Sequence, residues 1–142
     1  MMSSYELFET TADVGVRGFG STLEEAFENA AKAMFSVMVD LSGVKEEREV
    51  EVSCEAFDEE GLLVEWLNEL LALSSIEKMV FSSFEVKIDR EDDVLKLKGV
   101  ARGEKLDPGR HNLKTEVKAA TYSMIKVVKE GDRYVAQLIL DI

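Results

Sequence analysis

The spacing of hydrophobic residues changes several times along this 142-residue chain, and this change limits the available folds more than any other feature. From Glu49 to Ala56 apolar and polar residues alternate, which predicts a strand with one buried face. Between Leu23 and Met38, and again between Leu62 and Leu71, apolar residues recur at helical spacing. The chain is therefore expected to place two amphipathic helices among several strands.

Further strands are expected near both ends of the chain and in its second half. Alternation or short apolar runs indicate strands at Tyr5 to Phe8, Val14 to Phe19, Phe84 to Ile88, Leu95 to Leu97 and Tyr134 to Leu140. Glycines in the second of these strands allow bends or close backbone approach. The strand at Tyr134 to Leu140 completes this set. The last of these is apolar on both faces, which favours cover on both sides.

Two local assignments rest on weaker patterns. Ser21 with Glu24 resembles a capping box and places the start of the first helix there. The stretch from Leu113 to Ala120 fits helix or strand, and we favour one or two helical turns that lead into a strand around Tyr122 to Lys129. A turn at Gly131-Asp132 then leads into the last strand.

These elements predict an α+β fold in one domain that spans residues 1–142. Two main helices would pack on a largely antiparallel sheet in two layers. The length and the hydrophobic content of 46% fit a single domain with its own core. Two strand-helix-strand stretches suggest a duplicated unit, although no repeat in the sequence establishes it.

The net charge of −12 disfavours non-specific binding to nucleic acid phosphates or to an anionic membrane. The charge is unevenly distributed, because residues 96–129 hold nine basic and three acidic residues. This basic segment could orient a partner, and an ordinary solvated surface is the alternative. Within it, Lys105, Arg110, Lys114 and Lys118 are the candidates for partner contact.

The single cysteine and the single histidine give little support to nucleophilic catalysis or to a zinc site. A single cysteine excludes an intramolecular disulfide and fits a reducing compartment, and the place of Cys54 on the apolar face of an alternating strand favours a buried, inert thiol. His111 follows the Pro108-Gly109 loop, and we expect it to anchor that loop. With no basic and apolar leader and no run long enough to span a bilayer, we expect a soluble, cytoplasmic protein.

Carboxylates at the two ends of the chain form the remaining candidate site. Asp13 lies between the first two strands, and Asp141 and the terminal carboxylate of Ile142 follow the last strand. If the first and last strands are neighbours, three carboxylates converge, and their repulsion favours a divalent cation such as calcium, magnesium or manganese. An aspartate in a turn or near a terminus is also commonly a solvated residue, so the spacing leaves both readings open.

Several sequence blocks together resemble the archease family, in the right order and over nearly the whole chain. They are T-A-D-V-G from Thr11, S-T-L-E-E-A-F from Ser21, L-L-V-E-W-L-N-E-L-L from Leu62, R-H-N-L-K-T-E-V-K-A-A-T-Y from Arg110 and the terminal L-D-I. The resemblance implies a non-enzymatic accessory protein of the GTP-dependent tRNA-splicing RNA ligase. Such a protein promotes guanylylation and multiple turnover of the ligase catalytic subunit.

The resemblance also implies a metal site, usually described with calcium, whose ligands match Asp13, Asp141 and Ile142 here. The family often carries histidine at two positions where this chain has Thr10 and Ser123. A role in modulating tRNA methyltransferases is a second implication of the resemblance. From the residues alone, a small metal-dependent hydrolase that uses the carboxylate cluster stays open as an alternative.

Overall fold

The structure is a computed structural model that describes residues 4–142. Each helix follows a side-chain cap: the Thr22 hydroxyl accepts from the Glu25 amide, and the Asp58 carboxylate accepts from the Gly61 amide. The elements are, in order, β1 (Tyr5–Glu9), β2 (Val14–Gly20), α1 (Leu23–Met38), the short 3₁₀ helix η1 (Leu41–Gly43), β3 (Arg48–Ala56), α2 (Glu59–Glu77), β4 (Met79–Glu91), β5 (Val94–Lys105), β6 (Ala119–Ala120), β7 (Lys126–Glu130) and β8 (Arg133–Asp141).

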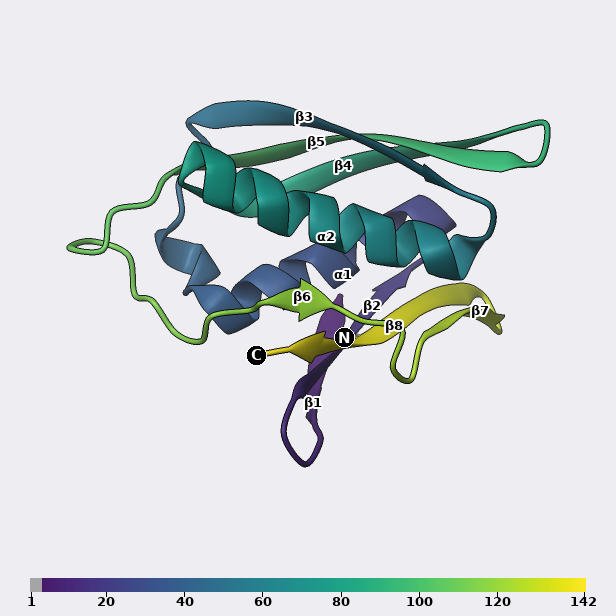
Figure 1. Ribbon diagram of the computed structural model, residues 1–142, viewed down its shortest axis with the longest axis horizontal. Helices are drawn as coiled ribbons and strands as arrows, with labels where there is room; N and C mark the ends of the chain where they lie inside the picture. The colour runs from purple at the N-terminus through teal and green to yellow at the C-terminus, as the bar shows by residue number, and fades with distance from the viewer. Residues whose placement is uncertain (1–3) are drawn as a thin grey trace.

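The strands form two antiparallel sheets. In one sheet β5 lies between β3 and β4, and in the other β8 pairs with β2, β6 and β7, while β1 pairs with β2. Both helices lie between the sheets (Figure 1). Helix α1 contacts β2 and β8 of one sheet and β4 of the other, and α2 contacts β3, β4 and β5 on one side and β6 and β7 on the other.

The predicted α+β class with two helices packed on antiparallel strands is confirmed, and the expected sheet is divided into two. The core lies where the helices meet the strands, and Trp66 is fully buried there. Its indole nitrogen donates to the carbonyl oxygen of Phe27 at 3.0 Å, so the polar edge of the ring also joins α2 to α1. Strand β8 is buried continuously from Val135 to Leu140, as its apolar sequence predicts.

Strand β2 approaches α1 so closely that a side chain at Gly18 would not fit. A β-carbon added there would overlap the backbone of Ala26 and Ala30. The expectation of close backbone approach at this glycine is therefore confirmed. This close packing fixes the position of β2, whose first residue, Val14, directly follows the candidate ligand Asp13.

Three expectations from the sequence need correction. Residues 113–118 form no helical turns and only 119–120 belong to a strand, because the amides of Lys114 and Thr115 donate to carbonyl groups near the end of α1. The following strand begins at Lys126, since residues 122–125 form a turn. The cap of α1 is Thr22 instead of Ser21, and the Glu25 carboxylate accepts a hydrogen bond from the Ser21 amide at 2.8 Å.

The two strand-helix-strand stretches are not equivalent in the fold. Helix α1 connects β2 of one sheet to β3 of the other, whereas α2 connects β3 and β4 within one sheet. The suggested duplication therefore has no counterpart in this topology.

Candidate functional site

The pairing of β2 with β8 places the two candidate aspartates at the same end of neighbouring strands. Val14 pairs with Leu140; Asp13 directly precedes the first of these residues and Asp141 directly follows the second. Asp13 is half-buried and Asp141 is exposed. The last strand thus pairs with the second strand and not with the first, and this pairing brings together two residues that are far apart in the sequence.

The turn before β2 is organised by Thr10. The Asp13 amide donates to the Thr10 hydroxyl oxygen at 3.2 Å, and that hydroxyl donates to the Asp13 carbonyl oxygen at 3.1 Å. These bonds fix the backbone of Asp13 and leave its carboxylate free for other partners. This positioning role of Thr10 was not predicted, although threonine hydroxyls are known to bond to nearby backbone groups in turns.

The last residue of β8, Asp141, is held by hydrogen bonds with the segment that contains β6. The Lys118 amide donates to the Asp141 carbonyl oxygen at 2.8 Å, and Ala119 pairs with Asp141. The side chain of Ile142 is half-buried and packs against the core. The backbone that carries the terminal carboxylate is therefore held beside Asp141.

The chemistry of these donors fits a hard divalent cation. Asp13 and Asp141 offer side-chain carboxylates, and the predicted third donor is a backbone carboxylate of Ile142. Oxygen ligands of this kind suit calcium, magnesium and manganese. Within residues 4–142, no group of three or more His, Cys, Asp or Glu side chains could hold a metal ion. A metal at this place would therefore depend on backbone oxygens or the terminal carboxylate as well as on the two aspartates.

The positions where the family often carries histidine both lie near these carboxylates. Thr10 holds the turn of Asp13, and the carbonyl oxygen of Ser123 accepts from the amide of Ile139 at 3.1 Å. Ile139 is two residues before Asp141. The two departures from the family pattern therefore affect the surroundings of the candidate site and leave its carboxylates in place.

Cys54 and His111 are outside this site. The Cys54 thiol is half-buried in β3, and burial, with smaller contributions from Glu65 and Glu69, raises its pKa to about 12. A thiol with so high a pKa is almost fully protonated at neutral pH and is a poor nucleophile. Cys54 packs against the core, as its place on the apolar face predicts, but it is only half-buried.

His111 anchors its loop, as the sequence predicts. Its Nδ1 accepts from the Asp107 amide at 2.8 Å, and its Nε2 lies 3.1 Å from the buried carboxylate of Glu104. Glu104 also forms an ion pair with Arg110 and accepts from the Lys45 amide at 2.6 Å. The Arg110 hydrogen bond contributes most to lowering the pKa of Glu104 to about 2, followed by the Lys45 amide. This buried cluster joins the long loop after β5 to the segment after η1.

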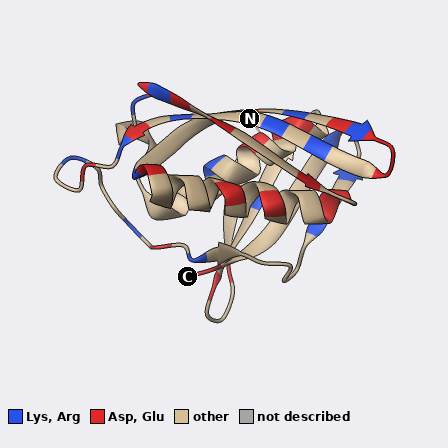
Figure 2. Ribbon diagram, turned by 45° about the horizontal axis from the view of Figure 1, so that its top comes forward, with Lys and Arg blue, Asp and Glu red and all other residues tan. Residues whose placement is uncertain are grey.

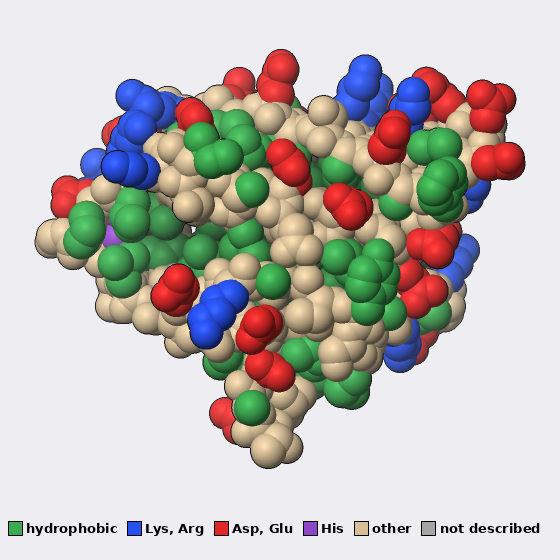
Figure 3. All heavy atoms as spheres, viewed as in Figure 1, with side chains coloured by type: hydrophobic (Ala, Val, Ile, Leu, Met, Phe, Trp, Pro, Cys, Tyr) green, Lys and Arg blue, Asp and Glu red, His purple; other side chains and the backbone are tan. Residues whose placement is uncertain are grey.

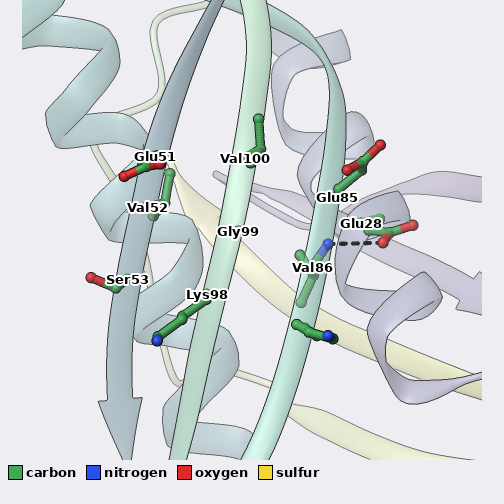
Figure 4. A pocket seen from close by; sticks show the side chains of 10 residues that line it. Glu28, Glu51, Val52, Ser53, Glu85, Val86, Lys98, Gly99 and Val100 are labelled. Atoms are coloured by element: carbon green, nitrogen blue, oxygen red, sulfur yellow. Dashed lines mark hydrogen bonds between the residues drawn. The ribbon is translucent and has the colours of Figure 1, made fainter.

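A broad hollow over the outer face of the β3-β5-β4 sheet contains none of the candidate ligands. Side chains of Glu51, Ser53 and Lys98 line it, and Glu28 of α1 reaches its edge (Figure 4). The Glu28 carboxylate is committed to the Val86 amide, from which it accepts a hydrogen bond at 3.0 Å. The hollow therefore provides no support for a second carboxylate centre.

Comparison with known proteins finds relatives that match nearly the whole chain. Residues 5–142 match the model of the archease protein family. Protein archease of Pyrococcus abyssi is 49% identical and that of Pyrococcus furiosus is 46% identical, and in each case the match covers 99% of this chain and 100% of the relative.

Two solved structures have a similar fold. The solution structure of protein 1598 of Methanobacterium thermoautotrophicum is 45% identical, with a TM-score of 0.89, and the match covers 99% of this chain and 100% of that one. A crystal structure of an archease from Thermotoga maritima has a TM-score of 0.59 at 23% identity, covering 95% and 94% of the two chains.

Among the described residues, no helix is long and apolar enough to cross a membrane.

Proposed function

The chain belongs to the archease family of accessory proteins, and on this premise we propose that it activates the tRNA-splicing RNA ligase without itself being an enzyme. In this proposal it promotes guanylylation of the ligase catalytic subunit and so allows each ligase molecule to join many RNA ends. The observation that carries the proposal is the placement of Asp13 beside Asp141 at the ends of two paired strands in a chain of this family.

The proposal includes a divalent metal, calcium in the first place, held by Asp13, Asp141 and the terminal carboxylate of Ile142. A divalent ion would offset the repulsion among these groups and would join the loop before β2 to the end of β8. The bonds of Thr10 and Lys118 support this assignment, because they fix the backbone on both sides of the carboxylates. Magnesium and manganese are the alternatives that the same oxygen donors allow.

A non-enzymatic role is supported by the environment of the single cysteine and the single histidine, a possible nucleophile and a possible base. The protonated thiol of Cys54 and the buried ring of His111 lie in different elements and have different partners. The acidic surface also favours contact with a protein over contact with RNA. We therefore propose a protein partner and no strong direct binding of nucleic acid.

The test is a guanylylation assay with purified ligase catalytic subunit, GTP and calcium. We expect this protein to increase the rate at which guanylylated ligase forms, and we expect no joining or hydrolysis when it is incubated alone with RNA and nucleotides. An unchanged guanylylation rate across a full titration would contradict the proposal. Turnover of RNA or nucleotide without ligase would favour the metal-dependent hydrolase instead.

A further inference from the structure

Three large apolar side chains are exposed where the start of α2 meets the turn between β6 and β7. Phe57 is 80% exposed, Tyr122 60% and Met124 58%. A methyl group placed on Gly61, in the first turn of α2, would lie 3.5 Å from the Tyr122 hydroxyl oxygen, so the two segments are in close proximity. We refer to Phe57, Tyr122 and Met124 as the apolar patch.

The backbone below the patch is held firmly. Asn68 of α2 forms two hydrogen bonds with the backbone of Ala120, at 2.9 and 3.1 Å. Buried Gln137 donates to the Met124 carbonyl oxygen at 2.8 Å, and the Thr121 hydroxyl donates to the Ile139 carbonyl oxygen, also at 2.8 Å. Because the backbone is already ordered, a partner that binds here loses little conformational entropy in fixing it.

Met124 has a backbone conformation that is unfavourable for its side chain. Its φ of 52° lies in the left-handed region, which glycine or asparagine adopts more easily. The turn thus retains an apolar residue, more than half exposed, at a place where a small polar residue would suit both the backbone and the solvent. Strain of this kind often occurs at functional positions.

On the α2 side of the patch the charges are all negative. Residues 57–77 contain no Lys or Arg, and Glu60, Glu65 and Glu69 of α2 are exposed. Figure 2 shows this row of acidic residues along α2, and Figure 3 shows acidic and hydrophobic side chains side by side on the same face of the molecule. A complementary surface would combine an apolar socket with Lys or Arg side chains around it.

We propose that the apolar patch, bordered by the acidic residues of α2, is the docking surface for the ligase, and that the ligase presents there an apolar socket rimmed with Lys or Arg. This inference rests on the proposed function. The patch and the candidate metal site lie on neighbouring segments, because Thr121, next to Tyr122 in the chain, is bonded to Ile139, two residues before Asp141.

The basic segment, which the sequence offered for partner contact, is a weaker candidate. The Arg110 guanidinium pairs with Glu104, the Lys105 ammonium donates to the Glu77 carbonyl oxygen at 2.8 Å, and the Lys114 ammonium lies 3.4 Å from the Ser36 carbonyl oxygen. These groups satisfy carbonyls and a carboxylate of their own chain. They are therefore less available to a partner than the patch is.

The test compares single substitutions by their affinity for the purified ligase catalytic subunit. We expect Tyr122→Glu and Met124→Glu each to weaken binding about tenfold or more, because central apolar anchors contribute most to an interface. Ile76→Glu is the matched control, since Ile76 is 72% exposed near the other end of α2, and it should bind as the wild type does. Thermal unfolding and calcium affinity should be the same in all four proteins.

A double reversal, Glu65→Lys with Glu69→Lys, tests the charged border. We expect slower association at about 0.1 M salt, and a difference from the wild type that fades toward about 1 M as charges are screened. Reversal of Lys114 and Lys118 to Glu should leave the association rate unchanged. If that reversal slows association while the patch variants bind normally, the basic segment is the docking surface and this inference is wrong.

The proposed function and the docking surface can fail separately. A wild-type protein that neither binds nor activates the ligase contradicts the proposed function and this inference with it. A wild-type protein that activates the ligase, with Tyr122→Glu and Met124→Glu equally active and equally tightly bound, contradicts only the docking surface. Sedimentation of the protein alone gives a further check: self-association that Tyr122→Glu abolishes would assign the patch to a second copy of this chain.

Discussion

At the scale of single residues, the buried carboxylate of Glu104 makes stability depend on pH. Its pKa is lowered from 4.5 to about 2 by the Arg110 hydrogen bond first, then by the Lys45 amide, with a smaller contribution from His111. A lowered pKa means that the folded state favours the carboxylate, so its contribution is complete above about pH 4.5 and is lost as the pH falls toward about 2. We expect Glu104→Gln to lower the melting temperature at pH 7 and to flatten its decrease within this window. Parallel slopes for wild type and variant between these pH values would contradict this prediction.

Met124 gives a second prediction, in which stability and binding change in opposite directions. Asparagine tolerates the left-handed backbone better than methionine does, so Met124→Asn should raise the free energy of unfolding by about 0.5–1 kcal/mol. The same change removes an apolar side chain from the docking surface and should weaken ligase binding. Urea denaturation measures the first effect, and a decrease in stability would show that Met124 contributes packing that its exposure does not reveal.

At the level of elements, the contact of β2 with α1 depends on Gly18. An alanine there would overlap the helix backbone, so one of the two elements must move, and overpacking of this kind costs about 1–3 kcal/mol. Gly43→Ala is the matched control, since a β-carbon at Gly43 meets nothing within 4 Å and its φ is not positive. Equal free energies of unfolding for the two variants would contradict the packing described here.

The sequence predicted most elements, because their signals are local. The alternation of β3 and the apolar spacing of α1 and α2 each lie within one element, and each appears in the structure. Residues 113–118 were assigned wrongly because their hydrogen-bond partners lie in distant parts of the chain, at Val37, Met38 and Asp141. No pattern within the segment contains that information.

At the level of the whole molecule, the pairing of β2 with β8 joins the two ends of the chain. The sequence could place Asp13 in a turn and Asp141 after the last strand, but only this long-range pairing makes them neighbours. The apolar patch was beyond sequence reasoning for a related reason: Phe57 and Tyr122 read as ordinary apolar residues until the fold shows that they are exposed together.

A metal bound by Asp13, Asp141 and Ile142 should stabilise the whole fold. Calcium at a hundredfold excess over its dissociation constant should add about 2.7 kcal/mol to the free energy of unfolding. Asp13→Asn, Asp141→Asn and a protein with one alanine added after Ile142 should each lose this gain, because the added residue moves the terminal carboxylate by about 3.5 Å. Calorimetric titration checks this, and wild-type calcium affinity in the extended protein would exclude the terminal carboxylate as a ligand.

The most direct test of the account is the number of RNA joints made per ligase molecule as this protein is titrated in, with GTP and calcium present. We predict that the number rises from about one toward many with the wild-type protein. It should stay near one with Asp13→Asn, although that variant still folds and retains the apolar patch. Equal stimulation by the wild type and Asp13→Asn would contradict the role of the carboxylate site, and no stimulation by either would contradict the proposed function itself.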